Sequence, residues 1–204
     1  MPRPRSLTPA RIATAALAVI DRSGLDALSM RAVATELGMG TMSLYRYVDD
    51  RGEVEALVVD LVLQGGDGAP PPGSAHHRLS ALADRVRVAV SGHPGVVPLL
   101  LTHRHRAPSS VRWGESVLTV LTEAGFTGTR RVVAFRAFLS YVFGALQVER
   151  LGPLEGAGTA ALAALPSDEF PILTRTARDA GSVGSEQEFR QGLDIVLRGL
   201  EIGR

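Results

Sequence analysis

The sequence SMRAVATELGMGTMSLYRYV, residues 29–48, contains two short helical patterns separated by a glycine-containing turn. Ser29 is a preferred N-cap residue, and the helix that follows it is predicted to stop at Gly38. Glycine suits this position because a side chain is disfavoured in the left-handed conformation that reverses the chain. A second helix of about seven residues is predicted to end at Tyr47. The two helices and their turn have the spacing of a helix-turn-helix.

The second helix of this pair is short, and most of its residues are polar. Such a helix buries little apolar surface, so it is better explained as a surface that reads a partner than as core. Leu44 and Val48 have the spacing to face the core, whereas the outward residues are Thr41, Met42, Ser43, Tyr45 and Arg46. Spacing alone leaves two alternatives open, a DNA-binding motif and an ordinary helical hairpin.

Helix signals continue on both sides of the motif, and the sequence shows no strand alternation and no internal repeat. Capping residues predict one helix over 9–23 and another over about 51–64. After a linker rich in Gly and Pro, apolar periodicity predicts helices over 75–91, 95–102, 109–124, 128–150, 168–180 and 186–201, with a short helical turn near 160–165. The predicted fold is all-α, with a small helical head at 6–66, a flexible linker at 67–74 and a larger helical body at 75–204.

Composition excludes several classes of protein. The 204 residues include no cysteine and no lysine, which rules out disulfides, thiolate metal sites and nucleophiles of either type. With 45% hydrophobic and 21% charged residues, the chain is expected to be globular. No apolar run reaches the roughly 18 residues that a membrane-spanning helix needs. No cleavage site follows the apolar N-terminal helix, so we expect a cytoplasmic protein with no membrane partner.

Positive charge is concentrated in two parts of the sequence. The 22 basic residues, all arginine, nearly balance 21 acidic residues, so a uniformly basic surface is excluded. Residues 1–48 carry six arginines against three acidic residues, and residues 74–112 carry six against one. A nucleic-acid-binding surface is therefore expected near the N-terminus or within 74–112.

The first third of the chain resembles the N-terminal DNA-binding domain of the tetracycline-repressor (TetR) family of bacterial transcription regulators. The motifs that carry the resemblance are GLDALS at 24–29, LGM at 37–39 and SLYRYV at 43–48, with Arg31 and Ala34 between them. Residues 75–204 resemble the effector-binding, dimerising domain of the family more loosely. The resemblance implies a sequence-specific regulator that needs no cofactor, a repressor that a small-molecule effector releases from a palindromic operator on double-stranded DNA.

The resemblance also assigns DNA contacts residue by residue. The start of the second helix is expected to meet base edges or nearby backbone, with Met42 against a thymine methyl, and the two tyrosines are expected to contact phosphates. Arg31 is expected to reach a guanine or a phosphate, and Arg51 to clamp the backbone. Arg3 and Arg5 are either an added arm contact or a charged tail. The expected contact set is Ser29, Arg31, Thr41, Met42, Ser43, Tyr45, Arg46, Tyr47 and Arg51.

For the body, the resemblance implies a homodimer and a ligand pocket. Two copies are expected to pair through a four-helix bundle made by the helices near 128–150 and 186–201. The recognition helices would then lie about 34–36 Å apart, in successive major grooves. An apolar pocket with a few polar groups is expected, although each aromatic residue taken singly also fits plain core. The expected lining is His103, Arg106, Trp113, Phe138, Tyr141, Phe143 and Gln147.

The sequence predicts neither a metal site nor an enzyme. All five histidines lie in 76–105, but the close pairs are spaced so that neither shares a helix face. No nucleophile elbow, phosphate-binding glycine loop or paired-carboxylate signature is present. Two alternatives remain: an activator or effector-independent regulator with a solid body, and a small helical enzyme or metal-binding protein that uses His103 and His105.

Overall fold

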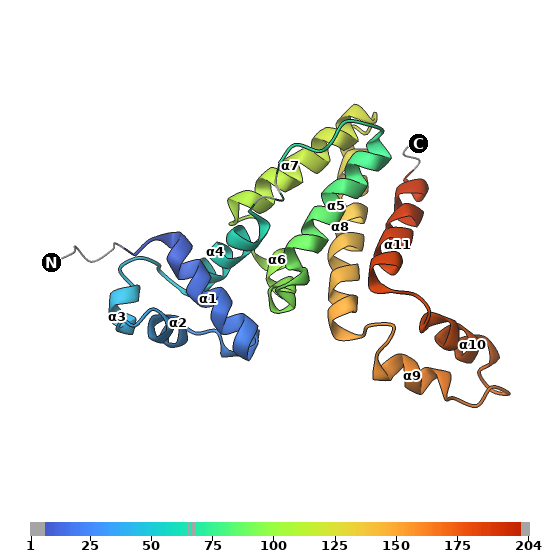
Figure 1. The fold of residues 1–204 in the computed structure, drawn as a ribbon. Helices are drawn as coiled ribbons and strands as arrows, with labels where there is room; N and C mark the ends of the chain where they lie inside the picture. The colour runs from blue at the N-terminus through green and yellow to red at the C-terminus, as the bar shows by residue number, and fades with distance from the viewer. Residues whose placement is uncertain (1–6, 65, 67, 201–204) are drawn as a thin grey trace. The chain divides into compact units, whose positions relative to one another are not determined.

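The computed structural model describes residues 7–64, 66 and 68–200, and within these residues it contains helices and no strand (Figure 1). The predicted all-α class is confirmed. The chain divides into two compact units, one with residues up to Pro72 and Ala81–Val120, the other with Gly73–Ser80 and the residues from Leu121 onward. The expected contact by Arg3 and Arg5 lies outside the described residues.

The first unit contains the N-terminal helices and the predicted capping residues. The Thr8 side chain accepts the Arg11 N–H at 3.3 Å, and Ser29 accepts the Ala32 N–H at 3.1 Å. Asp50 likewise accepts the N–H three residues later at 2.7 Å. These caps fix where the helices begin. The helices are α1 (Pro9–Ser23), α2 (Met30–Glu36), α3 (Thr41–Leu44), α4 (Arg51–Leu63) and α6 (Val97–His103), with most of α5 (Ala75–Ser91) and α7 (Pro108–Glu123).

The core of this unit forms where α1 packs against α2 and α4, and α4 against α6. The apolar stripe of α1 supplies Ile12 and Ile20, each at most 2% exposed. Leu28, between α1 and α2, is 1% exposed, and Leu44 of α3 is completely buried. Burial of these side chains stabilises a bundle that positions α2 and α3.

The second unit contains α8 (Gly128–Leu151), α9 (Ala157–Ala163), α10 (Pro171–Ala180) and α11 (Ser185–Gly199). Figure 1 shows α11 along α8, and α9 beside α10. The Tyr141 hydroxyl donates to the Phe189 carbonyl at 2.7 Å, which links α8 to α11. Gly192 allows this approach, since a Cβ there would overlap the tyrosine ring and its hydroxyl. The buried residues at this helix pair include Phe138, Phe189, Leu193 and Leu197.

The predicted helix boundaries differ most from the structure at three places. The second helix of the motif ends at Leu44, and the next turn tightens, with the Tyr47 N–H donating to the Leu44 carbonyl at 2.9 Å. The helix expected from 168 begins at Pro171, whose fixed φ and missing N–H suit a first helical position. The turn expected near 160–165 is part of a helix over Ala157–Ala163.

Helix α8 is long and apolar enough to cross a bilayer, and it is the one such helix in the described part of the chain. Composition of this kind is shared by membrane spans and by core helices. Six residues of α8 are buried within the protein, among them Phe138 and Val142 at no measurable exposure. The helix therefore contributes to the core of the second unit.

Candidate nucleic-acid interface

The turn between α2 and α3 has the geometry that the sequence predicts. Gly38 lies at φ +68°, in the left-handed region, and the Met39 N–H donates to the Ala34 carbonyl at 2.9 Å. Figure 1 shows α3 directly beside α2. Leu44 and Val48 are buried as the spacing predicts, at 0% and 3% exposure. The opposite side of α3 faces solvent.

The predicted DNA-contact residues all reach solvent. Met42 is 80% exposed, Tyr45 46% and Tyr47 45%, a large exposure for apolar and aromatic side chains. The guanidinium groups of Arg31 and Arg46 are exposed and have neither an ion pair nor a hydrogen bond within the described residues. Unpaired arginines next to exposed aromatic groups are suited to phosphates and base edges. Among the remaining predicted contacts, the exposed residues are Ser29 and Arg51, and the half-buried ones are Thr41 and Ser43.

An ion pair links the end of α1 to α2. Arg22, near the end of α1, contacts the Glu36 carboxylate at 2.7 Å. The hydrogen bond and charge of Glu36 raise the pKa of the Arg22 guanidinium above its ordinary value. Because both side chains are accessible to water, the pair stabilises the protein little and serves mainly to fix the helix end.

Arg51, the expected backbone clamp, belongs to a network that the sequence analysis missed. Its Nε donates to Glu55 Oε1 at 2.7 Å, and its Nη2 lies 3.4 Å from the Leu25 carbonyl. The other Glu55 oxygen lies 2.8 Å from Nε2 of His103, whose side chain is only 7% exposed. The i,i+4 spacing indicates the first contact. No pattern in the sequence indicates the second, because His103 is 48 residues away.

The residues expected to line a ligand pocket fall in both units. His103, Arg106 and Trp113 belong to the first unit, and Phe138, Tyr141, Phe143 and Gln147 lie on α8 in the second. Trp113 is 3% exposed, and its indole N–H already donates to the Leu82 carbonyl at 2.9 Å.

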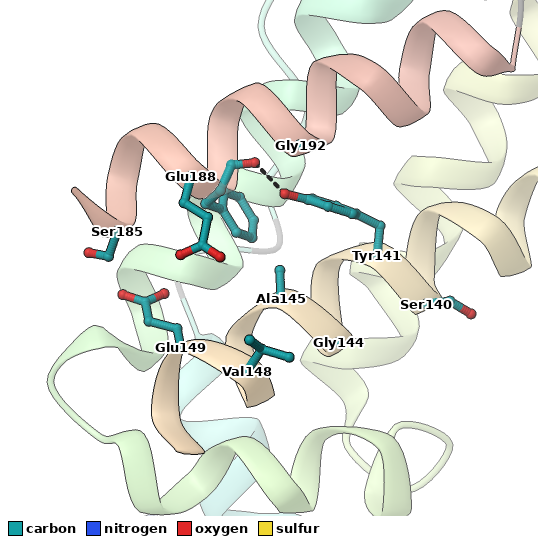
Figure 2. A pocket seen from close by; sticks show the side chains of 10 residues that line it. Ser140, Tyr141, Gly144, Ala145, Val148, Glu149, Ser185, Glu188 and Gly192 are labelled. Atoms are coloured by element: carbon teal, nitrogen blue, oxygen red, sulfur yellow. Dashed lines mark hydrogen bonds between the residues drawn. The ribbon is translucent and has the colours of Figure 1, made fainter. Parts of the chain in front are cut away.

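One of these residues, Tyr141, lines a hollow of about 400 Å³ between α8 and α11. Figure 2 shows the Glu149 and Glu188 side chains extending toward the same opening, and no basic residue lines it. Burial, followed by the charge of Glu188, raises the pKa of Tyr141, so its hydroxyl stays neutral and donates to the Phe189 carbonyl. Gly144, Ala145 and Gly192 supply the space.

Three of the histidines contact separate carboxylates. His103 contacts Glu55, His76 contacts Asp194 at 2.9 Å, and His93 contacts Asp21 at 2.8 Å. His105, two residues after His103, is exposed. Within the described ranges no three His, Cys, Asp or Glu side chains come together as metal ligands.

Comparison with known families matches both parts of the chain. Residues 12–51 match the family described as bacterial regulatory proteins, tetR family. Residues 67–203 match the family described as tetracyclin repressor-like, C-terminal domain. Among curated relatives, the chain is 32% identical to the HTH-type transcriptional repressor DrrR1 of Streptomyces coeruleorubidus, across 98% of this chain and 79% of that protein. It is 28% identical to the class D tetracycline repressor protein of Escherichia coli, over 92% of this chain and 86% of that one.

Solved structures give the same result. Apo ActR from Streptomyces coelicolor superposes with a TM-score of 0.81 at 28% identity, covering 97% of this chain and 96% of that chain. ActR in complex with actinorhodin superposes with a TM-score of 0.80, also at 28% identity and covering 97% of each chain. The similarity extends over the helix-turn-helix and the helices that follow it.

Proposed function

Because this chain belongs to the tetR family of bacterial regulatory proteins, we propose that it represses transcription by binding operator DNA through α2 and α3, and that a small-molecule effector releases it. The observation that carries this proposal is the exposed side of α3. Met42 on α3, and Tyr45 and Tyr47 in the turn that follows it, face water, and Leu44 is the buried residue of the helix. A short helix with this exposure suits insertion into a major groove.

The nine predicted DNA contacts keep the roles assigned from the sequence. Residues at the start of α3 meet base edges or nearby backbone, and Arg31 reaches a guanine or a phosphate. The two tyrosines, Tyr45 and Tyr47, contact phosphates, and Arg51 clamps the backbone. Two copies of the chain pair through α8 and α11, so that the two α3 helices read the halves of a palindrome. The protein acts in the cytoplasm, where its DNA is, and as a regulator without enzymatic activity.

We assign effector binding to the second unit, which contains α8 to α11. ActR, at 28% identity, has been solved in complex with actinorhodin, so binding of a small molecule is supported by a relative. Aromatic residues of α8, Phe138, Tyr141 and Phe143, supply apolar surface, and Gln147 supplies a hydrogen-bonding amide. An apolar lining with few polar groups is typical of small-molecule sites.

Replacing Tyr45 or Arg51 with alanine is expected to weaken DNA binding several-fold. Each change removes a phosphate contact, and the loss of the Arg51 charge should also reduce the salt dependence of log K by about one unit. The measurement is fluorescence anisotropy with a duplex that the wild-type protein enriches from a random pool. Arg175→Ala, which removes an exposed arginine of α10, is the control and should bind like wild type. If Tyr45→Ala and Arg51→Ala both bound DNA with wild-type affinity, the proposed DNA-binding surface would be refuted.

The effector proposal makes a prediction through thermodynamic linkage. A compound that releases the repressor must bind DNA-free protein more tightly than DNA-bound protein, and by the same factor that it weakens DNA binding. Compounds that raise the melting temperature of the free protein are therefore titrated by calorimetry with and without the selected duplex. If every such compound binds both forms equally, none of them is an effector, and regulation by a small molecule is contradicted.

A further inference from the structure

The guanidinium of Arg106 lies at the amino end of α4. Arg106 follows α6 in a turn closed by its own N–H, which donates to the His103 carbonyl at 2.9 Å. A Cβ built on Gly52, in the first turn of α4, would stand 2.9 Å from Arg106 Nη1 and 3.1 Å from Asp50 Oδ1. All these residues belong to the first compact unit. The structure thus brings a residue expected in a ligand pocket to the turn of α4 that also contains Arg51, the expected phosphate clamp.

Arg106 has no ion-pair partner at this place within the described residues. It is exposed and forms no ion pair or side-chain hydrogen bond with any residue that the structure describes. Nearby acidic groups have other partners: Asp50 caps α4 by accepting the Glu53 N–H, and Glu55 is bound by Arg51 and His103. A cation at the amino end of a helix is unfavourable, because the helix dipole is positive there. The arrangement favours an anion over the protein alone.

His103, which lies near the first turn of α4, also has a polar atom without a hydrogen-bond partner. Its side chain is 7% exposed, and Nε2 faces Glu55. Nδ1 is buried and has no hydrogen-bond partner within the described residues. The ring edge points at the same spot, since Cε1 lies 3.7 Å from the position of a Cβ on Gly52. Buried polar atoms are nearly always paired, so this unpaired nitrogen calls for an explanation.

Gly52 itself is explained by the same arrangement. It is a helical residue at an ordinary φ, where alanine would be the better helix former. A Cβ would push the Arg106 guanidinium away from the helix end. Glycine at 52 therefore lets the guanidinium reach the first turn of α4.

We propose that Arg106 and Arg51 together hold one backbone phosphate of the operator over the first turn of α4. The proposal rests on the proposed function, and it extends the DNA-binding surface from the helix-turn-helix to the turn between α6 and α7. Two guanidinium groups and free backbone N–H groups of a helix end are a favourable combination for phosphate, because each hydrogen bond is charge-assisted. Arg106 is thereby assigned to DNA in place of the ligand pocket.

The test compares Arg106→Gln with Arg104→Gln. Arg104 is exposed in the same turn, but its Nη1 already donates to the Leu101 carbonyl at 2.7 Å. With the duplex that wild type selects, affinity is measured by anisotropy over a series of salt concentrations. Arg106→Gln should bind several-fold more weakly and reduce the salt slope by about one unit, while Arg104→Gln keeps the wild-type slope.

Gly52→Ala provides a second, independent variant. It should favour the helix and weaken DNA binding by less than Arg106→Gln does, because the guanidinium lies at the end of a flexible side chain and can shift. The double variant should be no weaker than Arg106→Gln alone. A wild-type slope in Arg106→Gln would overturn the inference while leaving the proposed function intact. Failure of wild type to select any duplex would instead contradict the proposed function.

A free phosphate ion has the same chemistry as a DNA phosphate, so inorganic phosphate is tested separately. If phosphate raises the melting temperature of wild type but not of Arg106→Gln, and the two proteins have equal DNA salt slopes, the site binds the free ion and the DNA inference is wrong. Loss of the phosphate contact to duplex in Arg106→Gln supports the inference whether or not the free ion binds.

Discussion

Replacing Leu44 with alanine is expected to lower the free energy of unfolding by about 2–5 kcal/mol and to remove most DNA binding. Leu44 is completely buried and is the only buried residue of α3. A helix of one turn is unstable by itself in water, because its nucleation costs more than its hydrogen bonds return. The Leu44 side chain therefore holds α3 on the core, and its truncation releases the residues that contact DNA. Chemical denaturation measures the first effect, and anisotropy with the selected duplex measures the second.

Met42→Ala is the matched control on the same helix. Met42 is 80% exposed, so its truncation should change the free energy of unfolding by no more than about 0.5 kcal/mol. Its effect on DNA should be confined to bases that offer a methyl group. If Leu44→Ala kept wild-type affinity for the duplex at a temperature where it is folded, α3 would not be the reading helix.

Local signals in the sequence were sufficient to predict most helices of this protein. Ser29 and Asp50 cap α2 and α4 as expected, since an N-cap depends only on a side chain and an N–H three residues away. Gly38 marks the turn for a similarly local reason. The resemblance then gave the function of the exposed residues around it, which spacing alone left undecided.

Contacts between distant residues could not be predicted in this way. His103 meets Glu55, and Arg106 approaches Gly52, only because α6 packs on α4. No periodicity in either segment identifies its partner. The assignment of Arg106 to a ligand pocket followed from its position near His103 in the sequence, and the structure gives it a different neighbour.

The hollow beside Tyr141 was also beyond sequence reasoning. Its space comes from small residues, Gly144 and Ala145 on α8 and Gly192 on α11. The two helices are far apart in the sequence. Its acidic character comes from Glu149 on α8 and Glu188 on α11. Neither helix alone shows a cavity or a charge cluster.

The outer side of α8 is the surface through which we expect a second copy of the chain to bind. Its exposed residues recur every three or four positions, which places them in one stripe along the helix: Val133, Arg136, Ser140, Gly144, Val148 and Leu151. Leu151 is 67% exposed, and on the neighbouring helix Ile195 is 63% exposed. Exposed apolar side chains on one side of a helix, here Val133, Val148 and Leu151, are characteristic of a protein interface. Since Gly144 interrupts the stripe with no side chain, a partner helix can approach closely there.

Val133→Glu is expected to convert the dimer to monomer and to weaken binding to a palindromic duplex strongly. Val133 is 60% exposed, and a two-fold axis would bring a glutamate from each copy into the same interface. Like charges there cost several kcal/mol, so the dimer dissociation constant should rise about a hundredfold. Sedimentation velocity measures the oligomeric state. Val88→Glu on α5, where the valine is 67% exposed, makes the same chemical change on a helix outside the proposed bundle and should remain dimeric. A dimeric Val133→Glu protein would refute pairing through this stripe, since a buried pair of carboxylates cannot be accommodated there without loss of affinity.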